Sequence, residues 1–513
     1  MWLPDLEPRS ALEVAGSFTM SNLTFVAANI TIALTVLAVI AVAAAALRPA
    51  LAPSEQPLPL ATALALSAGG FALILFVFLA AGWIGWRLWW VVAALVHLGT
   101  AAAIVLTTRR AASLQLRISP EWRRAAPALG FLVWMIAFDS LKCFEPQFEA
   151  DALWYHLTLP NFWLNAGGLR AHPGLTVAGY PLLIEMIYTA PISYGLPYAT
   201  RLIHLAFGVG IVVAIYGWLR RGTGVSPVIP GQDGQATFPD RRLTPAASLA
   251  FATIFFVFDS VNEVAAWAHT DLARAFFLVC AATALAAYLD RNDRRHLVVT
   301  AVLSGLAMST HYMAVVFGNG LLTVALIVTR VRRRQTRARQ IAAELAIFWL
   351  VSTATFAPWL LKNIVHYGRP FYGLAGTSFR VPTGAIIGGF FLGNVFFVGC
   401  AALAVWFLAR RPSAPGERLL AAYLLAYLVV GAFELPPIPR FFLPVYAVGL
   451  MLAGRAVAPF LSGRRSLEVV LGFALLAFGI ATTCYQWRQH LYDAPLDFVF
   501  HNSPRAATIQ WHL

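Results

Sequence analysis

Charged residues are scarce in this 513-residue sequence. Asp, Glu, Lys and Arg together make up 12% of it, whereas hydrophobic residues make up 59%. Charged residues are about a quarter of an ordinary soluble globular domain. The composition therefore excludes a soluble domain, and we expect lipid to surround most of the chain.

Cysteine and nucleotide-binding motifs are also largely missing. The four cysteines are scattered, with no CxxC pair and no His at metal-ligand spacing, which excludes a disulfide framework and a structural zinc site. A Walker loop, a dinucleotide-binding glycine fingerprint, a zinc-protease motif and a nucleophile elbow are absent. A soluble ATP or nucleotide-sugar enzyme is therefore not supported. The cysteines are Cys143, Cys280, Cys400 and Cys484.

Lysine is almost absent, although the net charge is +14. Lys142 and Lys362 are the only lysines, so nearly all the positive charge is arginine. Most of these arginines form short clusters between apolar runs, with dense clusters in 108–125 and 330–340. Cytoplasmic loops of membrane proteins carry such clusters. We therefore interpret the charge as a sign of topology, and expect no nucleic-acid partner.

Long apolar runs dominate the rest of the sequence. A membrane-spanning helix needs about 20 apolar residues, and the runs predict an all-α, polytopic transmembrane protein with about 14 spans. We expect three N-terminal spans in 1–125, a membrane core in 126–484 and a short external tail in 485–513. The runs are 23–47, 61–81, 88–106, 126–141, 199–219, 244–258, 264–288, 297–309, 312–329, 341–361, 383–409, 418–434, 440–460 and 466–484.

One apolar stretch, 179–195, is not predicted to cross the membrane. A crossing there would place Arg220 and Arg221 outside. This would contradict the positive-inside rule, by which arginine clusters lie on the cytoplasmic side. Its two prolines, Glu185 and its modest length favour an interfacial or re-entrant helix. The region 142–198 then becomes one large external loop with juxtamembrane helices. The expected location is the plasma (inner) membrane, with this loop facing the periplasm or the cell exterior.

Acidic and aromatic residues crowd at the start of that loop, in DSLKCFEPQFEADALWYHLTLPNFWLNAGGL. Asp151 and Tyr155 lie one turn apart on an expected amphipathic helix, where the carboxylate is suited to accept a proton from a sugar or lipid hydroxyl. Glu145 and Glu149 fit the same chemistry or a merely solvated loop. His156 fits an interfacial or structural role as well as a substrate-binding one.

A second candidate is Asp271, which enters a helix in the sequence AHTDLARAFF. Thr270 or His269 is suited to cap this helix, and Asp271 would favour its dipole. Capping alone would explain these residues. The alternative is a functional role, because an ionisable group at membrane depth with Arg274 one turn later is costly unless it lines a polar cavity.

A third candidate is a set of cations and polar groups on the outer side. Lys142 and Lys362 are predicted at outer helix ends, and Arg440 lies in the stiff segment PPIPRFFLP. Lysine and arginine on the outer side are unusual under the positive-inside rule, and their charge suits an anionic ligand such as a phosphate. Snorkelling to ordinary lipid headgroups is the alternative. A tight outer turn adds His311 and Tyr312 as candidate substrate-binding residues.

Six segments resemble, in order, those of the GT-C superfamily of integral-membrane glycosyltransferases. The resemblance is strongest to bacterial family 39 and 83 enzymes, which include lipid A aminoarabinose transferases and protein O-mannosyltransferases. It covers about residues 126 to 460. The segments are ADALWYHLTLPNFWLNAGGLR, YPLLIEMIYTAPISYG, HTDLARAFFLVCAATALAAYL, GLAMSTHYMAVVFG, PWLLKNIVHYGRPFYG and PRFFLPVYAVGLMLAG.

This resemblance implies transfer of a sugar from a polyprenyl-phosphate carrier to a lipid, glycan or protein acceptor on the outer face. Asp151 would correspond to the first-loop acid that deprotonates the acceptor, while Lys362 and Arg440 would stabilise the phosphate leaving group. Asp151 is not followed by the Glu of the commonest pair in the family, and three spans are additional. The acceptor class and any divalent cation therefore stay open, and no cofactor is assigned.

A multispan transporter or lipid flippase is the main alternative. Such proteins usually carry internal repeats and broken helices near the bilayer midplane, whereas this sequence shows no convincing repeat and its candidate polar residues gather on one face. An O-antigen ligase or polymerase would place its main external loop late in the chain, rich in Arg and His. Here the main loop is early and acidic, which favours the glycosyltransferase.

Overall fold

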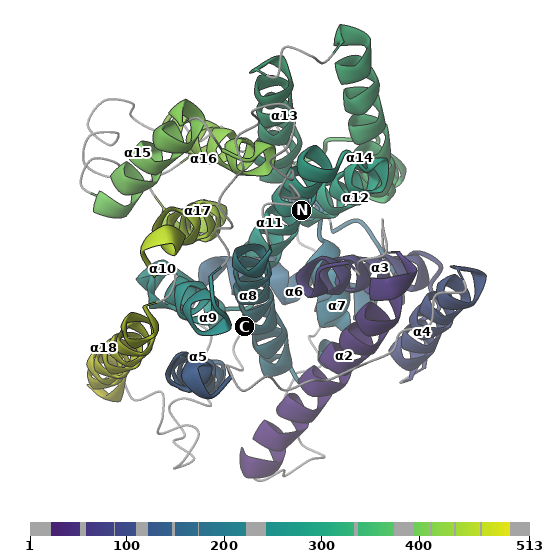
Figure 1. Ribbon diagram of the computed structural model, residues 1–513. Coiled ribbons are helices and arrows are strands. Elements are labelled where there is room, and N and C mark those ends of the chain that lie inside the picture. Colours follow the sequence, from purple (N-terminus) through teal and green to yellow (C-terminus); the bar gives the residue numbers. More distant parts are fainter. Residues whose placement is uncertain are drawn as a thin grey trace.

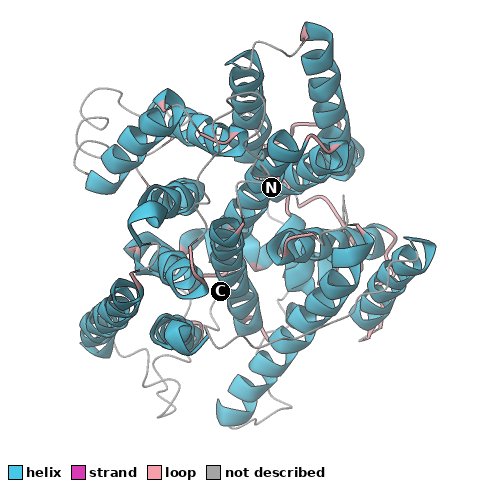
Figure 2. Ribbon diagram, in the orientation of Figure 1, coloured by secondary structure: helices cyan, strands magenta, loops and turns pink. Residues whose placement is uncertain are grey.

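The computed structural model is helical wherever it is described. Its described residues contain helices, turns and bends but no strand (Figure 2), which confirms the predicted all-α class. The N-terminal 21 residues and most of the predicted tail lie outside the described part. The structure describes residues 22–51, 58–86, 88–108, 122–145, 149–172, 174–221, 243–332, 337–373, 394–410, 413–435, 438–461 and 464–492.

Ten described helices are long and apolar enough to cross a membrane, so the protein has the helices of a multi-pass membrane protein. A bent pair, Pro245–Val257 and Asp259–Ala265, makes an eleventh if it counts as one span. The ten are formed by α2 (Asn22–Ala50), α3 (Leu60–Ala80), α4 (Trp89–Thr108), α5 (Trp122–Lys142), α8 (Tyr198–Arg220), α11 (Asp271–Arg291), η4 with α13 (Val315–Gly320, Leu321–Arg332), α14 (Ala338–Tyr367), α16 (Pro415–Glu434) and η7 with α17 (Pro439–Phe442, Leu443–Leu461).

Three further predicted runs also form helices that are not among these ten candidate spans. They are α12 (Arg294–Thr310), α15 (Val395–Ala409) and α18 (Arg465–Tyr492). The bent pair comprises α9 (Pro245–Thr253), η3 (Ile254–Val257) and α10 (Asp259–Ala265), and it bends by 74°. The count of about 14 spans therefore stays a prediction.

Helix α11 lies at the centre of the bundle (Figure 1). It packs against α8, α12, α16 and α17, and its apolar window is completely buried. Alanine recurs along the helix, and small residues let neighbouring helices approach closely in a membrane. The first residue of α11 is Asp271, so the central position of this helix places that carboxylate inside the protein rather than against lipid.

Close packing between α12 and α14 depends on a glycine. A Cβ atom added at Gly305 would lie 2.5 Å from the carbonyl oxygen of Ser352 and 2.6 Å from the Cβ of Thr355. Only a residue without a side chain fits this contact. The last turns of α12, which lead into His311 and Tyr312, are thereby held against the long helix α14.

The N-terminal helices pack against the loop region that follows α5. Helix α3 contacts both α7 (Leu183–Ile192) and α8, and the Leu79 carbonyl accepts a 3.0 Å hydrogen bond from the Leu169 amide. The first three helices are therefore part of the same bundle, and they cover one side of the loop that carries the candidate catalytic residues.

The described residues of the region 142–198 include four short helical segments, η1 (Ala152–His156), α6 (Thr158–Asn165), η2 (Thr176–Gly179) and α7. The predicted amphipathic helix is interrupted at Leu157, between the π-helical turn η1 and α6. Helix α7 has only ten residues and is not among the candidate spans. Its residues Leu183–Pro191 are all buried, so α7 is enclosed by neighbouring helices instead of lying on an open interface.

Candidate active site

Ionisable side chains from three distant segments converge at one end of α11. Glu149 and Asp151 come from the start of the loop, and Arg440 from the short helix η7 that leads into α17. The remaining members belong to the start of α11 and the turn before it. We call this group the acid–base cluster; its members are Glu149, Asp151, His269, Asp271, Arg274 and Arg440.

His269 is held between two carboxylates. Its Nε2 lies 2.5 Å from Glu149 Oε2, and its Nδ1 lies 3.2 Å from Asp271 Oδ2. Burial alone would lower the pKa of His269, but the two hydrogen bonds outweigh it and raise the pKa above the usual value. Burial works against ionised Glu149 as well, yet the hydrogen bond and charge of His269 lower its pKa to about 2. The two acids therefore favour the protonated form of His269, in which both ring nitrogens donate a hydrogen bond.

Arg440 joins all three carboxylates of the cluster, but at unequal distances. Its Nη2 lies 2.7 Å from Asp151 Oδ2, its Nη1 is 3.4 Å from Glu149 Oε1, and its Nε is 3.9 Å from Asp271 Oδ2. The Asp151 side chain is 30% exposed, compared with 13% for Glu149 and 10% for Asp271. Asp151 is therefore the carboxylate that an incoming hydroxyl reaches most readily.

The charges of the cluster balance. Arg274 donates a 2.7 Å hydrogen bond to Asp271 Oδ1, so three carboxylates face two guanidinium groups and the protonated His269. Buried ions are strongly destabilising unless they are paired and hydrogen-bonded. This balance explains how so many ionised groups lie together in a largely apolar protein.

Neighbouring helices fix the backbone around His269 and Asp271. The Tyr188 hydroxyl of α7 donates a 2.5 Å hydrogen bond to the His269 carbonyl, and the Leu272 amide donates to His204 Nε2 of α8 at 3.2 Å. The side chain of the N-cap residue Thr270 makes no capping hydrogen bond, so the capping role considered for it is absent. Asp271 is positioned by ion pairs with His269 and Arg274.

A buried pair of His156 and Glu185 lies next to the cluster. Their Nδ1 and Oε1 atoms share a 2.6 Å hydrogen bond, and the ring of His156 is 4.9 Å from that of His269. Burial raises the pKa of Glu185 to about 8, while burial and the charge of His269 keep the pKa of His156 well below its usual value. Both groups are therefore neutral at pH 7.

Aromatic rings border the cluster on the side of η2. The Tyr180 ring centroid lies 6.3 Å from that of Tyr155, and 5.8 Å from both His311 and Tyr312. Burial and the charge of Arg274 lower the pKa of His311 to about 3, so this imidazole is neutral. The four residues Tyr155, Tyr180, His311 and Tyr312 form what we call the aromatic border.

Lys362 is used to hold the backbone of this border. Its Nζ donates to the carbonyls of Ala178 and Tyr180, at 2.7 and 3.2 Å. Asn363 Nδ2 and the Tyr312 hydroxyl both donate to the carbonyl of Gly179 that lies between them, at 2.7 and 3.0 Å. Three side chains thus clamp three consecutive carbonyl groups at the end of η2.

Lys142 is also engaged by the protein. Its Nζ donates to the backbone and side-chain oxygens of Asn262, at 3.0 and 2.8 Å, and lies 3.6 Å from Asp139 Oδ1. Among the described residues, neither lysine contacts the acid–base cluster. The structure thus brings together Asp151, His269, Asp271 and Arg440, places the aromatic border and His156 beside them, and keeps the lysines apart.

Three members of the cluster have the residue types of a metal site. Donor atoms of Glu149, Asp151 and His269 all lie within 4.8 Å of one another. However, His269 Nε2 is turned to Glu149, and the Asp151 carboxylate accepts a hydrogen bond from Arg440. A cation would have to displace both of these contacts. The arrangement therefore does not fit a metal as it stands, and no step below depends on one.

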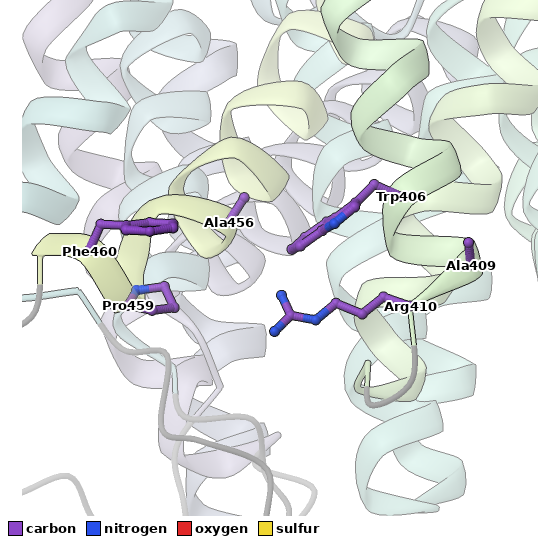
Figure 3. A pocket seen from close by; sticks show the side chains of 6 residues that line it. All are labelled: Trp406, Ala409, Arg410, Ala456, Pro459 and Phe460. Carbon is purple, nitrogen blue, oxygen red and sulfur yellow. The ribbon is translucent and has the colours of Figure 1, made fainter.

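A separate pocket lies between α15 and α17, away from the cluster. It has a volume of about 620 Å³, and Figure 3 shows side chains of the two helices facing each other across it. None of its described lining residues is an acid or a histidine, so these residues offer no group for proton transfer. The lining residues are Trp406, Ala409, Arg410, Ala456, Pro459 and Phe460.

Comparison with known proteins found no matching protein-family model and no matching curated protein. The chemistry of the cluster therefore has to be argued from its own residues. Two residues of the site, Glu149 in the cluster and Glu185 beside it, were only weakly indicated by the sequence. Glu149 was compatible with a solvated loop, and the one signal for Glu185 was a lone acid in the apolar run YPLLIEMIY.

Proposed function

We propose that the protein is a glycosyltransferase that moves a sugar from a polyprenyl-phosphate carrier to an acceptor hydroxyl. The observation that carries this proposal is the 2.7 Å pairing of the accessible Asp151 carboxylate with Arg440. Such a site holds, side by side, a base for the acceptor and a cation for a phosphate leaving group. The resemblance to GT-C enzymes predicts the same two roles, at the outer face of the plasma membrane.

The proposed reaction is a direct displacement at the anomeric carbon. The acceptor oxygen forms the new bond to this carbon while its proton passes to Asp151, which is the general base. The bond between the anomeric carbon and the phosphate oxygen breaks, and its electron pair leaves with the polyprenyl phosphate. Arg440 stabilises the charge of that leaving group through its guanidinium hydrogen bonds.

The other members of the cluster keep this arrangement fixed. Glu149 and Asp271 hold His269 from opposite sides, and Asp271 also binds Arg274. Groups that are fixed before the reaction need no reorganisation in the transition state. The aromatic border supplies flat ring faces beside the cluster for the sugar, since rings of Tyr and His combine an apolar face with a polar edge.

The proposal is tested by exchanging the base for its amide. Purified wild type and Asp151→Asn are assayed for transfer from a panel of polyprenyl-phosphate sugars to membrane extract. A lost general base lowers the rate about 10² to 10⁴-fold, so we expect this loss with an unchanged thermal melt. Asp259→Asn is the matched control, because Asp259 is an exposed carboxylate on α10 that lies outside the cluster.

Two results would contradict this function. Unchanged transfer by Asp151→Asn would remove Asp151 from the mechanism. No transfer by wild type from any donor would argue against an enzyme, and lipid movement would then be measured in reconstituted vesicles to test the transporter or flippase alternative.

A further inference from the structure

We propose that the ion pair between Asp151 and Arg440 is a latch that keeps the base masked until the phosphate of the donor binds. This inference rests on the proposed function, and it concerns the order of events in the same site. In the structure, Arg440 Nη2 donates to Asp151 Oδ2 at 2.7 Å. A carboxylate that accepts this charged hydrogen bond is a weaker base toward an acceptor hydroxyl.

Arg440 is suited to exchange partners because its present contacts leave much of its guanidinium unused. Only the contact with Asp151 is short; those with Glu149 and Asp271 are 3.4 and 3.9 Å. Its buried Nε has no hydrogen-bond partner among the described residues. A guanidinium has five N–H donors that match a phosphate in two-pronged geometry. A donor phosphate would therefore satisfy Arg440 better than the carboxylates do.

Asp151 is the carboxylate that such an exchange would set free. Glu149 keeps its bonds to His269 and to the Ala152 amide, and Asp271 keeps those to His269 and Arg274. Within the described part of the chain, Arg440 is the only hydrogen-bond or ion-pair partner of Asp151. Phosphate binding to Arg440 thus leaves one accessible carboxylate without a partner, and this carboxylate is the base.

The latch makes the reaction ordered. Before the donor binds, Asp151 is paired with Arg440 and does not activate a hydroxyl group. After the donor binds, the unpaired Asp151 carboxylate lies beside the phosphate leaving group. The same exchange means that Asp151 competes with the donor phosphate for Arg440. Removing the charge of Asp151 therefore lowers transfer and yet tightens binding of the phosphate, and the latch requires that this tightening depend on Arg440.

A double-mutant cycle measures this competition. The probe is decaprenyl phosphate, titrated into wild type, Asp151→Asn, Arg440→Gln and the double variant in detergent micelles, with intrinsic tryptophan fluorescence as the signal. A partly exposed ion pair contributes up to about 1 kcal/mol. We therefore expect Asp151→Asn to bind about fivefold more tightly, which is that energy converted at about 1.4 kcal/mol per tenfold.

The cycle also predicts a loss and a null effect. Arg440→Gln should bind the probe more weakly than wild type, and Asp151→Asn should change nothing in that background because the competing pair is already broken. Asp259→Asn controls for the general removal of one negative charge and is expected to shift affinity less than twofold, since exposed charges are screened by salt. Arg440→Met, which also removes the charge that pairs with Asp151, is a second variant in case Arg440→Gln does not fold.

The outcomes separate the latch from the proposed function. If Arg440 is needed for the probe but Asp151→Asn binds no more tightly than Asp259→Asn, the latch is overturned and the proposed function stands. If Asp151→Asn also tightens binding in the Arg440→Gln background, the pair is not the cause and the latch is overturned. If folded wild type does not bind the probe at all, both proposals are overturned.

Discussion

Glu149 contacts both His269 and Arg440 in the acid–base cluster. Replacing it by Gln gives a prediction for both stability and its pH dependence. The amide keeps an oxygen for the Ala152 amide but loses the charge that pairs with His269 at 2.5 Å and Arg440 at 3.4 Å. A hydrogen bond to a charged group contributes about 1.5 to 3 kcal/mol. Because a neutral bond to His269 remains, we expect Glu149→Gln to lower the free energy of unfolding by about 2 kcal/mol.

The same substitution should change the pH dependence of stability in a defined direction. The pKa of His269 is raised, so its contribution is complete below its ordinary value of 6.5 and is lost as the pH rises through the raised value. Glu149→Gln removes one cause of this increase, so the alkaline loss should be smaller than in wild type and should end at a lower pH. The pKa of Glu149 is lowered to about 2, so wild type also loses stability from pH 4.5 downward, and the variant lacks that loss.

The measurement is unfolding of wild type and variant in mixed SDS and detergent micelles, repeated between about pH 2 and pH 9, which covers both predicted losses. Asp259→Asn again serves as the control, because Asp259 lies outside the cluster. Parallel pH profiles for Glu149→Gln and wild type, with equal stability throughout, would refute the inference that Glu149 pairs with a protonated His269.

Two further predictions concern the groups around the cluster. Burial raises the pKa of Glu185 from 4.5 to about 8, so the folded state keeps a proton that the unfolded chain loses. The stability of wild type should therefore fall as the pH rises from 4.5 to 8. Glu185→Gln should lack this fall when the thermal melts of both proteins are measured across that range. Lys362→Met leaves two buried backbone carbonyls without their donor, at a cost of about 2 kcal/mol in unfolding free energy; if Lys362 serves instead only to bind phosphate, stability should be unchanged and only probe binding should suffer.

The sequence could identify most members of the cluster but not their pairing. Asp151, His269, Asp271 and Arg440 each stood out as a polar group at an expected helix end. The pair of Asp151 and Arg440 joins positions 289 residues apart, and the contact of Glu149 with His269 joins positions 120 residues apart. No local pattern reports such distances. For the same reason Glu149 was indistinguishable from a solvated loop residue until His269 and Arg440 were placed beside it.

The two lysines show a different limit of prediction from sequence. An outer-side lysine is chemically suited to a phosphate, and that was the prediction for Lys142 and Lys362. In the structure the ammonium groups bind oxygens of Asn262 and of the carbonyls at the end of η2. A buried ammonium group needs acceptors wherever the fold provides them, and residue type alone does not reveal whether these acceptors belong to a ligand or to the chain.

The sequence by itself determined the all-α class of the protein and the approximate place of the ten candidate spans that the structure describes. Each membrane helix satisfies its backbone hydrogen bonds internally, so its apolar run can be recognised without knowing its neighbours. Tertiary structure alone decided which helix became central, that α7 was enclosed, and that three carboxylates met two arginines and one histidine. These are relations between distant segments, and the energy that stabilises them exists only when the segments are packed together.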